Sequence, residues 1–166
     1  RILDLDHVVR SRARSFAVQR FDPEGAAAVS GADAAAKSAA VASDKMMRWM
    51  AEIVADESED SSKLTEKLFH REKVIDKVQA EIIQFLTDLL SANVPHSVAR
   101  EGRLHLRVAD EVESITDYIS GVLKNHLTLR EGELELSESE RLAIDALHTE
   151  VTAYLAEVLA AFGEDN

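Results

Sequence analysis

The sequence contains no cysteine, and it has only 6 glycines and 2 prolines in 166 residues. Without cysteine the chain has no disulfide bond, no thiolate metal ligand and no thiol nucleophile. Scarce glycine and proline, together with abundant alanine, leucine, glutamate and valine, favour a helical class. We therefore expect an all-α protein, and the length is sufficient for one domain with a sizeable core.

The sequence also lacks a long apolar run and a net positive charge. No run reaches the roughly 18 residues needed to cross a bilayer, and no signal peptide is visible. A net charge of -12 argues against nucleic acid as a partner. No P-loop, dinucleotide-binding glycine motif, nucleophile elbow or zinc-protease motif is present, and we expect a non-enzymatic protein.

The first 20 residues differ in charge from the remainder. They hold five arginines against two aspartates, a net of +3, which leaves -15 for the rest of the -12 total. Because cytoplasmic flanks of membrane spans are rich in lysine and arginine, this start is either a solvated tail or a juxtamembrane segment. The chain begins with Arg1 and not with methionine. We therefore expect it to be part of a longer polypeptide, with any membrane part outside this sequence.

Helical periodicity organises the rest of the chain. We predict a juxtamembrane linker over residues 1–22 and one helical domain over residues 23–166, an antiparallel up-down bundle. Asp22 and Pro23 resemble a helix cap and a first helical residue, but glycines weaken a helix there, and the first long helix is expected to start near Gly31. The four long helices are expected over residues 33–56, 60–91, 97–128 and 138–162.

The fourth helix is expected to open with a capping box formed by Ser137 and Glu140. Apolar residues at helical spacing predict which side chains of each helix face the core. Val54 is expected in the core stripe of the first long helix, and Val122 in that of the third. The predicted core stripe of the fourth helix consists of Ile144, Leu147, Val151, Tyr154, Leu155, Val158 and Phe162.

Two Glu-x-x-x-Asp pairs suggest a chemical role. Glu72 and Asp76 lie on the second helix, and Glu113 and Asp117 lie on the third, with a breaker segment at 91–96 between them. The midpoint of 72 and 117 is 94.5, and 76 and 113 share it. In an antiparallel hairpin about that point, Glu72 faces Asp117 and Asp76 faces Glu113. Asp110 shares the helix face of the second pair, at the edge of this group.

Clustered carboxylates repel one another unless a cation, a base or protons intervene. Residues four apart on a helix project toward the same region, and two such pairs could bridge one or more hard or borderline cations. The candidate ions are iron, zinc and manganese, and the candidate ligands are Glu72, Asp76, Asp110, Glu113 and Asp117. The alternative is a solvated acidic face, in which nearby basic residues neutralise the carboxylates without metal. These bases are Arg71, Lys73, Arg107 and Lys124.

Histidine gives weaker signals. Asp145 and His148 form one possible ligand pair at i, i+3 spacing, but such a pair is most often a surface feature. A di-iron centre of the ferritin type needs Glu-x-x-His on two helices, and the sequence contains none. The remaining histidines show no repeated spacing. We therefore do not expect an oxidase.

The segment LRVADEVESITDYISGVLKN, residues 106–125, resembles the signature that closes a three-helix repeat in PhoU-like domains. Glu72 to Asp76 (EKVID) resembles the second-helix motif of the same repeat. The chain departs from the signature at Thr116, where glycine is usual, at Tyr118, and at the Gly121-Val122 pair. The positions that match the signature are Arg107, Ala109, Asp110, Glu113, Ile115 and Asp117.

More narrowly, residues 33–163 resemble the cytoplasmic C-terminal domain of bacterial sodium/phosphate cotransporters. The resemblance implies a PhoU-like three-helix repeat plus a fourth helix, and a regulatory role on the cytoplasmic side of the cell membrane. Its implied partner is the membrane domain of the same polypeptide. A homodimer would restore the two repeats of a full PhoU protein. The alternatives are a soluble PhoU-type metal-binding regulator of phosphate uptake or signalling, and a plain helical interaction module.

Overall fold

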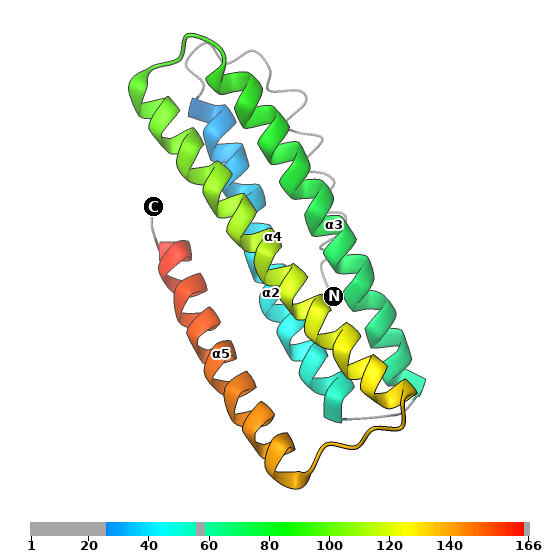
Figure 1. Cartoon of the computed structure of the whole chain (residues 1–166). Helices are drawn as coiled ribbons and strands as arrows, with labels where there is room; N and C mark the ends of the chain where they lie inside the picture. Colours follow the sequence, from blue (N-terminus) through cyan, green and yellow to red (C-terminus); the bar gives the residue numbers. More distant parts are fainter. Residues whose placement is uncertain (1–25, 56–58, 165–166) are drawn as a thin grey trace.

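The computed structural model describes residues 26–55 and 59–164, and this part of the chain is all-α. Successive helices run antiparallel, as Figure 1 shows, so the predicted antiparallel bundle is confirmed. None of the helices described is long and apolar enough to cross a membrane. The predicted linker over residues 1–22 and the predicted helix start at Asp22 lie outside the described residues. The helices are α2 (Ala26–Ala55), α3 (Glu59–Leu90), α4 (His96–Glu131) and α5 (Glu138–Glu164).

The core lies between α2, α3 and α4, each of which packs against the other two, whereas α5 packs on α2. On α2 the inward stripe is rich in alanine, and these small side chains allow the neighbouring helices to approach closely. Larger side chains fill the remaining space, and the largest that are fully buried include Met46, Ile53, Leu68, Leu86 and Leu123. The three-helix core therefore fixes the relative position of α3 and α4.

Two helix boundaries differ from the sequence prediction by several residues. Helix α2 begins at Ala26 and continues through Gly31, because Val29 and Ala32 are buried and their packing outweighs the low helix propensity of glycine. Helix α4 extends to Glu131, since Gly132 keeps near-helical angles (φ -82°, ψ 2°). The chain turns only at Glu133, which takes a left-handed conformation with φ 52°.

The predicted capping box at the start of α5 is confirmed. The backbone N–H of Ser137 donates to Glu140 Oε2 at 2.8 Å, and the Ser137 hydroxyl donates to the same oxygen at 2.6 Å. In return the backbone N–H of Glu140 donates to Ser137 Oγ at 3.4 Å. These hydrogen bonds stabilise the carboxylate and hold the pKa of Glu140 below its usual value.

The predicted core stripe of α5 is largely wrong. Leu155 is buried and Phe162 is partly buried, but the other five predicted core residues are exposed. The physical reason is that α5 packs on a single helix, so only one side of its wide apolar surface is covered. Val54 and Val122 were also expected in the core and are 36% and 50% exposed. The five exposed residues of α5 are Ile144, Leu147, Val151, Tyr154 and Val158.

Candidate cation site between helices α3 and α4

Three of the five predicted ligands lie together across the hairpin of α3 and α4. Asp76 comes from α3, and Glu113 and Asp117 come from successive turns of α4. One ligand oxygen from each of these residues lies within 4.8 Å of the other two. Asp76 and Glu113 are partly buried, and Asp117 is exposed. A single ion placed among these oxygens would be reached by side chains from both helices.

The core packing beneath the carboxylates fixes their position. Ile75 and Val112, the residues immediately before Asp76 and Glu113, are both buried in the core. Each carboxylate therefore leaves its helix at the boundary between the core and solvent. Because the two backbones are anchored one residue away, the cluster does not depend on a flexible loop.

Small buried hydroxyl side chains line the same side of α4. Thr116 and Ser120 are 0% and 1% exposed. The Thr116 hydroxyl donates to the backbone carbonyl of Glu113 at 2.9 Å, and the Ser120 hydroxyl donates to that of Asp117 at 3.1 Å. Both hydroxyls thus satisfy their hydrogen bonds within α4, and they leave the carboxylates of the cluster without a hydroxyl donor from these residues.

One oxygen of the cluster is buried and has no partner. Asp76 Oδ1 is inaccessible to solvent and has no hydrogen-bond partner. Buried polar atoms in folded proteins are nearly always paired, so an orphaned carboxylate oxygen needs a physical explanation. A cation at this position would provide the missing partner. The residues present therefore fit a cation, and this observation is independent of the clustering of negative charge.

The electrostatics of the cluster favour either protons or a cation. Burial raises the pKa of Asp76, the negative charge of Asp117 raises it further, and a backbone hydrogen bond and Lys124 partly oppose the shift. Burial also raises the pKa of Glu113, followed by the charges of Asp117, Asp76, Asp110 and Glu72. Glu113 therefore lies within the electrostatic influence of all four other predicted ligands.

The two remaining predicted ligands have other neighbours. Asp110 Oδ1 accepts a hydrogen bond from Gln79 Nε2 of α3 at 2.9 Å. Glu72 Oε1 lies 3.9 Å from Lys124 Nζ, and the lysine side chain is 61% exposed. A pair so long and so exposed contributes little. We therefore assign Asp76, Glu113 and Asp117 to the centre of the site and place Glu72 and Asp110 at its margin.

The basic residues proposed as counter-ions neutralise the cluster only in part. Lys124 approaches Glu72 and also lies over the ring of Phe69, 5.7 Å from its centroid. The guanidinium of Arg71 lies over Trp49 at 5.5 Å. Within the described part of the chain, neither Lys73 nor Arg107 makes an ion pair with any of the five acids. Of the four bases, Lys124 is therefore the one with a described ion pair to a member of the acidic group.

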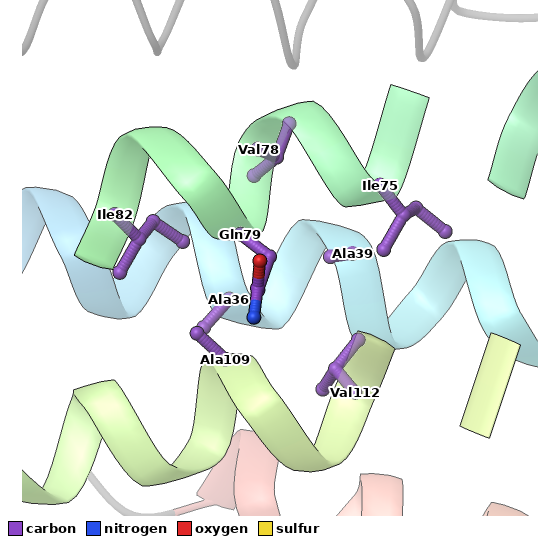
Figure 2. Close-up of a pocket in the computed structure, with 8 residues that line it drawn as sticks. All are labelled: Ala36, Ala39, Ile75, Val78, Gln79, Ile82, Ala109 and Val112. Carbon is purple, nitrogen blue, oxygen red and sulfur yellow. The ribbon is translucent and has the colours of Figure 1, made fainter. Parts of the chain in front are cut away.

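A small apolar pocket lies behind the cluster, between α2, α3 and α4. Figure 2 shows Gln79, the donor to Asp110, among the lining residues, with its side chain directed from α3 toward α4. The pocket has room for about one water molecule, whereas ligand pockets usually measure several hundred Å³. It is therefore a small packing defect and not a ligand pocket. Its lining residues are Ala36, Ala39, Ile75, Val78, Gln79, Ile82, Ala109 and Val112.

In the second possible ligand pair, Asp145 and His148, the histidine has a structural role in this fold. His148 Nε2 lies 3.2 Å from the backbone carbonyl oxygen of Met47, so the tautomer protonated at Nε2 donates to it. The other ring nitrogen lies 3.5 Å from the hydroxyl of Thr152. Nε2 of His148 is thus engaged at the contact between α5 and α2, Nδ1 lies beside a residue of α5 itself, and we do not assign this histidine a metal.

No protein-family model, curated protein or solved structure matches the chain. The geometry of the cluster therefore carries the interpretation of the site. Carboxylate oxygens are the donors that hard cations prefer, and this group contains neither histidine nor cysteine. A cation held here would link α3 to α4 and would neutralise part of the mutual repulsion of the acids.

Proposed function

We propose that this chain is a non-enzymatic, cation-binding regulatory domain of a sodium-dependent phosphate transporter, located on the cytoplasmic side of the membrane. One observation carries the cation-binding part of the proposal. Three carboxylates from two helices converge within 4.8 Å, and one of their oxygens is buried without a hydrogen-bond partner. The phosphate-transport part is supported by the resemblance of residues 106–125 to the PhoU-like signature.

Asp76, Glu113 and Asp117 would hold the ion, with Glu72 and Asp110 within reach of a second ion or of bound water. A set made only of oxygen donors suits manganese or iron better than zinc, which more often takes nitrogen or sulfur. A bound cation supplies positive charge, and this charge cross-links α3 to α4. The hairpin would then be more rigid when loaded, and its surface would be less negative.

The rigid and less negative state is what the domain would present to its partner. The proposed partner is the membrane domain of the same polypeptide, and regulation would act through contacts with it. The proposal requires apolar spans of about 20 residues elsewhere in that polypeptide. The negative charge of -12 argues against nucleic acid as a partner.

Cation binding can be tested with a matched pair of variants on α4. Glu113→Gln removes a ligand from the centre of the site, whereas Glu111→Gln removes an exposed carboxylate of the same helix that lies outside the cluster. In equilibrium dialysis with manganese, iron or zinc, we expect the first variant to lose at least about tenfold in affinity, or about 1.4 kcal/mol. The second variant should bind like the wild type. Equal binding by both variants would contradict the site.

The regulatory role needs a separate experiment in cells. The full polypeptide carrying Asp76→Asn and Glu113→Gln should reach the membrane in the same amount as the wild type. Its sodium-driven phosphate uptake should respond to phosphate supply differently from that of the wild type. The Glu111→Gln polypeptide is the control. If the variant has lost metal but phosphate uptake is unchanged, the cation site would stand and the role in transport would be contradicted.

A further inference from the structure

A largely buried histidine lies at the contact between the N-terminal parts of α4 and α2. The side chain of His105, on α4, is 12% exposed, and its Nδ1 atom is buried without a hydrogen-bond partner. Asp33 Oδ1, on α2, lies 3.8 Å from this nitrogen, which is too far for a hydrogen bond. Buried polar atoms are nearly always paired, so this nitrogen needs an explanation separate from that of the cation site.

The carboxylate of Asp33 lies between two bases. Its Oδ2 atom pairs with Lys37 Nζ, one turn further along α2, at 3.1 Å, whereas its Oδ1 atom is the one nearer the histidine. Lys37 Nζ also lies over the ring of Phe162 on α5, 5.4 Å from the centroid. The charged groups that act on His105 are thus Asp33 and Lys37 from α2, and Glu101 from the preceding turn of α4. Within the described residues, α3 and α5 add no charge to this group.

Protonation changes what the ring of His105 offers to its neighbours. Neutral imidazole has one N–H donor, and the buried Nδ1 makes no hydrogen bond here. The imidazolium ion has a donor on both nitrogens and a positive charge, so it attracts Asp33 and repels Lys37. It also places a charge in a tightly packed contact between two helices, where a charge that is not fully paired costs free energy.

The balance of these effects has a definite sign. Burial lowers the pKa of His105 below its ordinary value of 6.5, the charges of Asp33 and Glu101 partly oppose the shift, and Lys37 adds to it. Between the lowered pKa and 6.5, the unfolded state binds more protons than the folded state. The free energy of unfolding therefore decreases as the pH falls through that interval. Acid thus weakens the fold at His105, whereas it relieves repulsion at the cation site.

The helix turns around His105 have features that favour local opening. Helices α2 and α4 both begin at this end of the bundle, as Figure 1 shows. Gly31 in α2 and Gly102 in α4 lower the helix propensity of these turns. The buried side chains of α2 here are small, such as Ala32 and Ala35, so opening these turns exposes little apolar surface.

We propose that His105 is a proton-sensitive switch, and that protonation of its ring loosens the contact between the N-terminal parts of α2 and α4. The charged ring moves toward Asp33 and solvent, and the first turns of both helices open more often. Because α2 begins at Ala26, the change acts at the point where residues 1–25 connect to this helix. The inference does not depend on the cation site.

Titration of the histidine ring protons by NMR tests the first step. The chain has six histidines, and the signal of His105 is the one missing from His105→Gln. Its midpoint should lie below 6.5 in the wild type. Asp33→Asn should lower the midpoint further, because it removes an opposing negative charge, and Lys37→Met should raise it. A midpoint at or above 6.5, or one that neither substitution moves, would overturn the proposal.

Hydrogen exchange in chelator tests the opening itself, with a matched pair of histidines on α4. His105→Gln removes the buried ring, whereas His96→Gln removes an exposed one. The intrinsic effect of pH on exchange is corrected for, and residues 75–86 of α3 serve as the internal reference. Between about pH 7.5 and about pH 5.5, the wild type should lose at least about threefold in protection over residues 26–36 and 98–106. His96→Gln should lose the same, and His105→Gln should keep its protection.

Asp33→Asn gives a test that does not require the histidine to be removed. Its loss of protection should move to lower pH together with the NMR midpoint of His105, because both report the same proton. Circular dichroism confirms that each variant is folded. Unchanged protection in the wild type, an equal loss in His105→Gln, or a loss that does not follow the midpoint of the ring would overturn the proposal.

Discussion

At the scale of single residues, the register of the α3–α4 hairpin was predictable from the sequence. The turn at 91–96 and the common midpoint of 94.5 place Asp76 opposite Glu113, and these residues lie together in the structure. Gln79 and Asp110 share the same midpoint, and their side chains are joined by a hydrogen bond of 2.9 Å. This contact tests the register independently of the three central carboxylates, since an amide and a carboxylate attract each other.

The composition of the cluster was less predictable than its register. Sequence spacing treats Glu72 and Asp76 alike, but Asp76 joins Glu113 and Asp117, whereas Glu72 has Lys124 as its neighbour. The outcome depends on how the two helices twist around each other and on which rotamers the core leaves free. A periodicity of 3.6 residues does not contain that information.

The raised pKa values give a pH dependence with a definite sign. In the absence of metal, Asp76 and Glu113 titrate above their ordinary values of 3.8 and 4.5 in the folded protein. Between the ordinary and the raised pKa values, the folded state binds more protons than the unfolded state. The free energy of unfolding therefore decreases as the pH rises through the raised pKa values. Acidification from neutral pH toward 4.5 should therefore restore stability that the cluster loses at neutral pH.

Urea unfolding in chelator at several pH values can measure this effect. The quantity to compare is the free energy of unfolding of the wild type minus that of the Asp76→Asn, Glu113→Gln double variant. This difference should increase on acidification, because the variant cannot take up the two protons. A difference that is constant with pH, or that falls on acidification, would show that burial and the neighbouring charges do not raise the pKa values of the two carboxyls in the folded protein.

Two glycines of α4 should respond differently to alanine. A Cβ atom at Gly121 meets nothing within 4 Å, so Gly121→Ala should gain the helix propensity of alanine, about 1 kcal/mol in the free energy of unfolding. At Gly102 the added Cβ would lie 3.2 Å from Leu90 Cδ2, and this crowding should cancel part of the gain. Chemical denaturation of both variants measures the difference. A larger gain at Gly102 than at Gly121 would contradict the packing described here.

At the scale of helices, all four long elements were predictable, because each has long apolar periodicity and clear breaks. Their packing was predicted less well. The apolar arc of α5 shows that this helix is buried on some side, but not how many neighbours are available to cover it. Five of its predicted core residues are exposed as a result. The early start of α2 was missed for a related reason, since local propensity does not report tertiary packing, and packing here overrides the low helix propensity of Gly31.

The single contact of α5 predicts uneven stability along the chain. The amides of α5 should exchange with solvent faster than the core amides of α2, α3 and α4, since opening α5 exposes little of the core. Leu155 is the buried anchor of α5, at 7% exposed. Leu155→Ala should accelerate exchange in α5 while leaving the other three helices protected. Hydrogen exchange by mass spectrometry measures this, and uniform protection across the four helices would contradict it.

At the scale of the whole molecule, the bundle combines a three-helix core with a net charge of -12. The core holds carboxylates from α3 and α4 close together, although the acids themselves repel one another. Such an arrangement costs stability in the absence of a cation and gains stability when one binds. We therefore expect cation concentration to set the stability of the fold as a whole.

Thermal melting of the wild type and of Asp117→Asn, each with chelator and with manganese, is the most direct test. Metal at about one hundred times its Kd should stabilise the wild type by about 2.7 kcal/mol, a rise in Tm of several degrees, and should raise the variant's Tm less. In chelator the variant should melt at the same temperature as the wild type or higher, because the substitution removes like-charge repulsion. A wild-type Tm that manganese, iron and zinc all leave unchanged, or an Asp117→Asn variant that is destabilised equally with and without metal, would contradict the cation site.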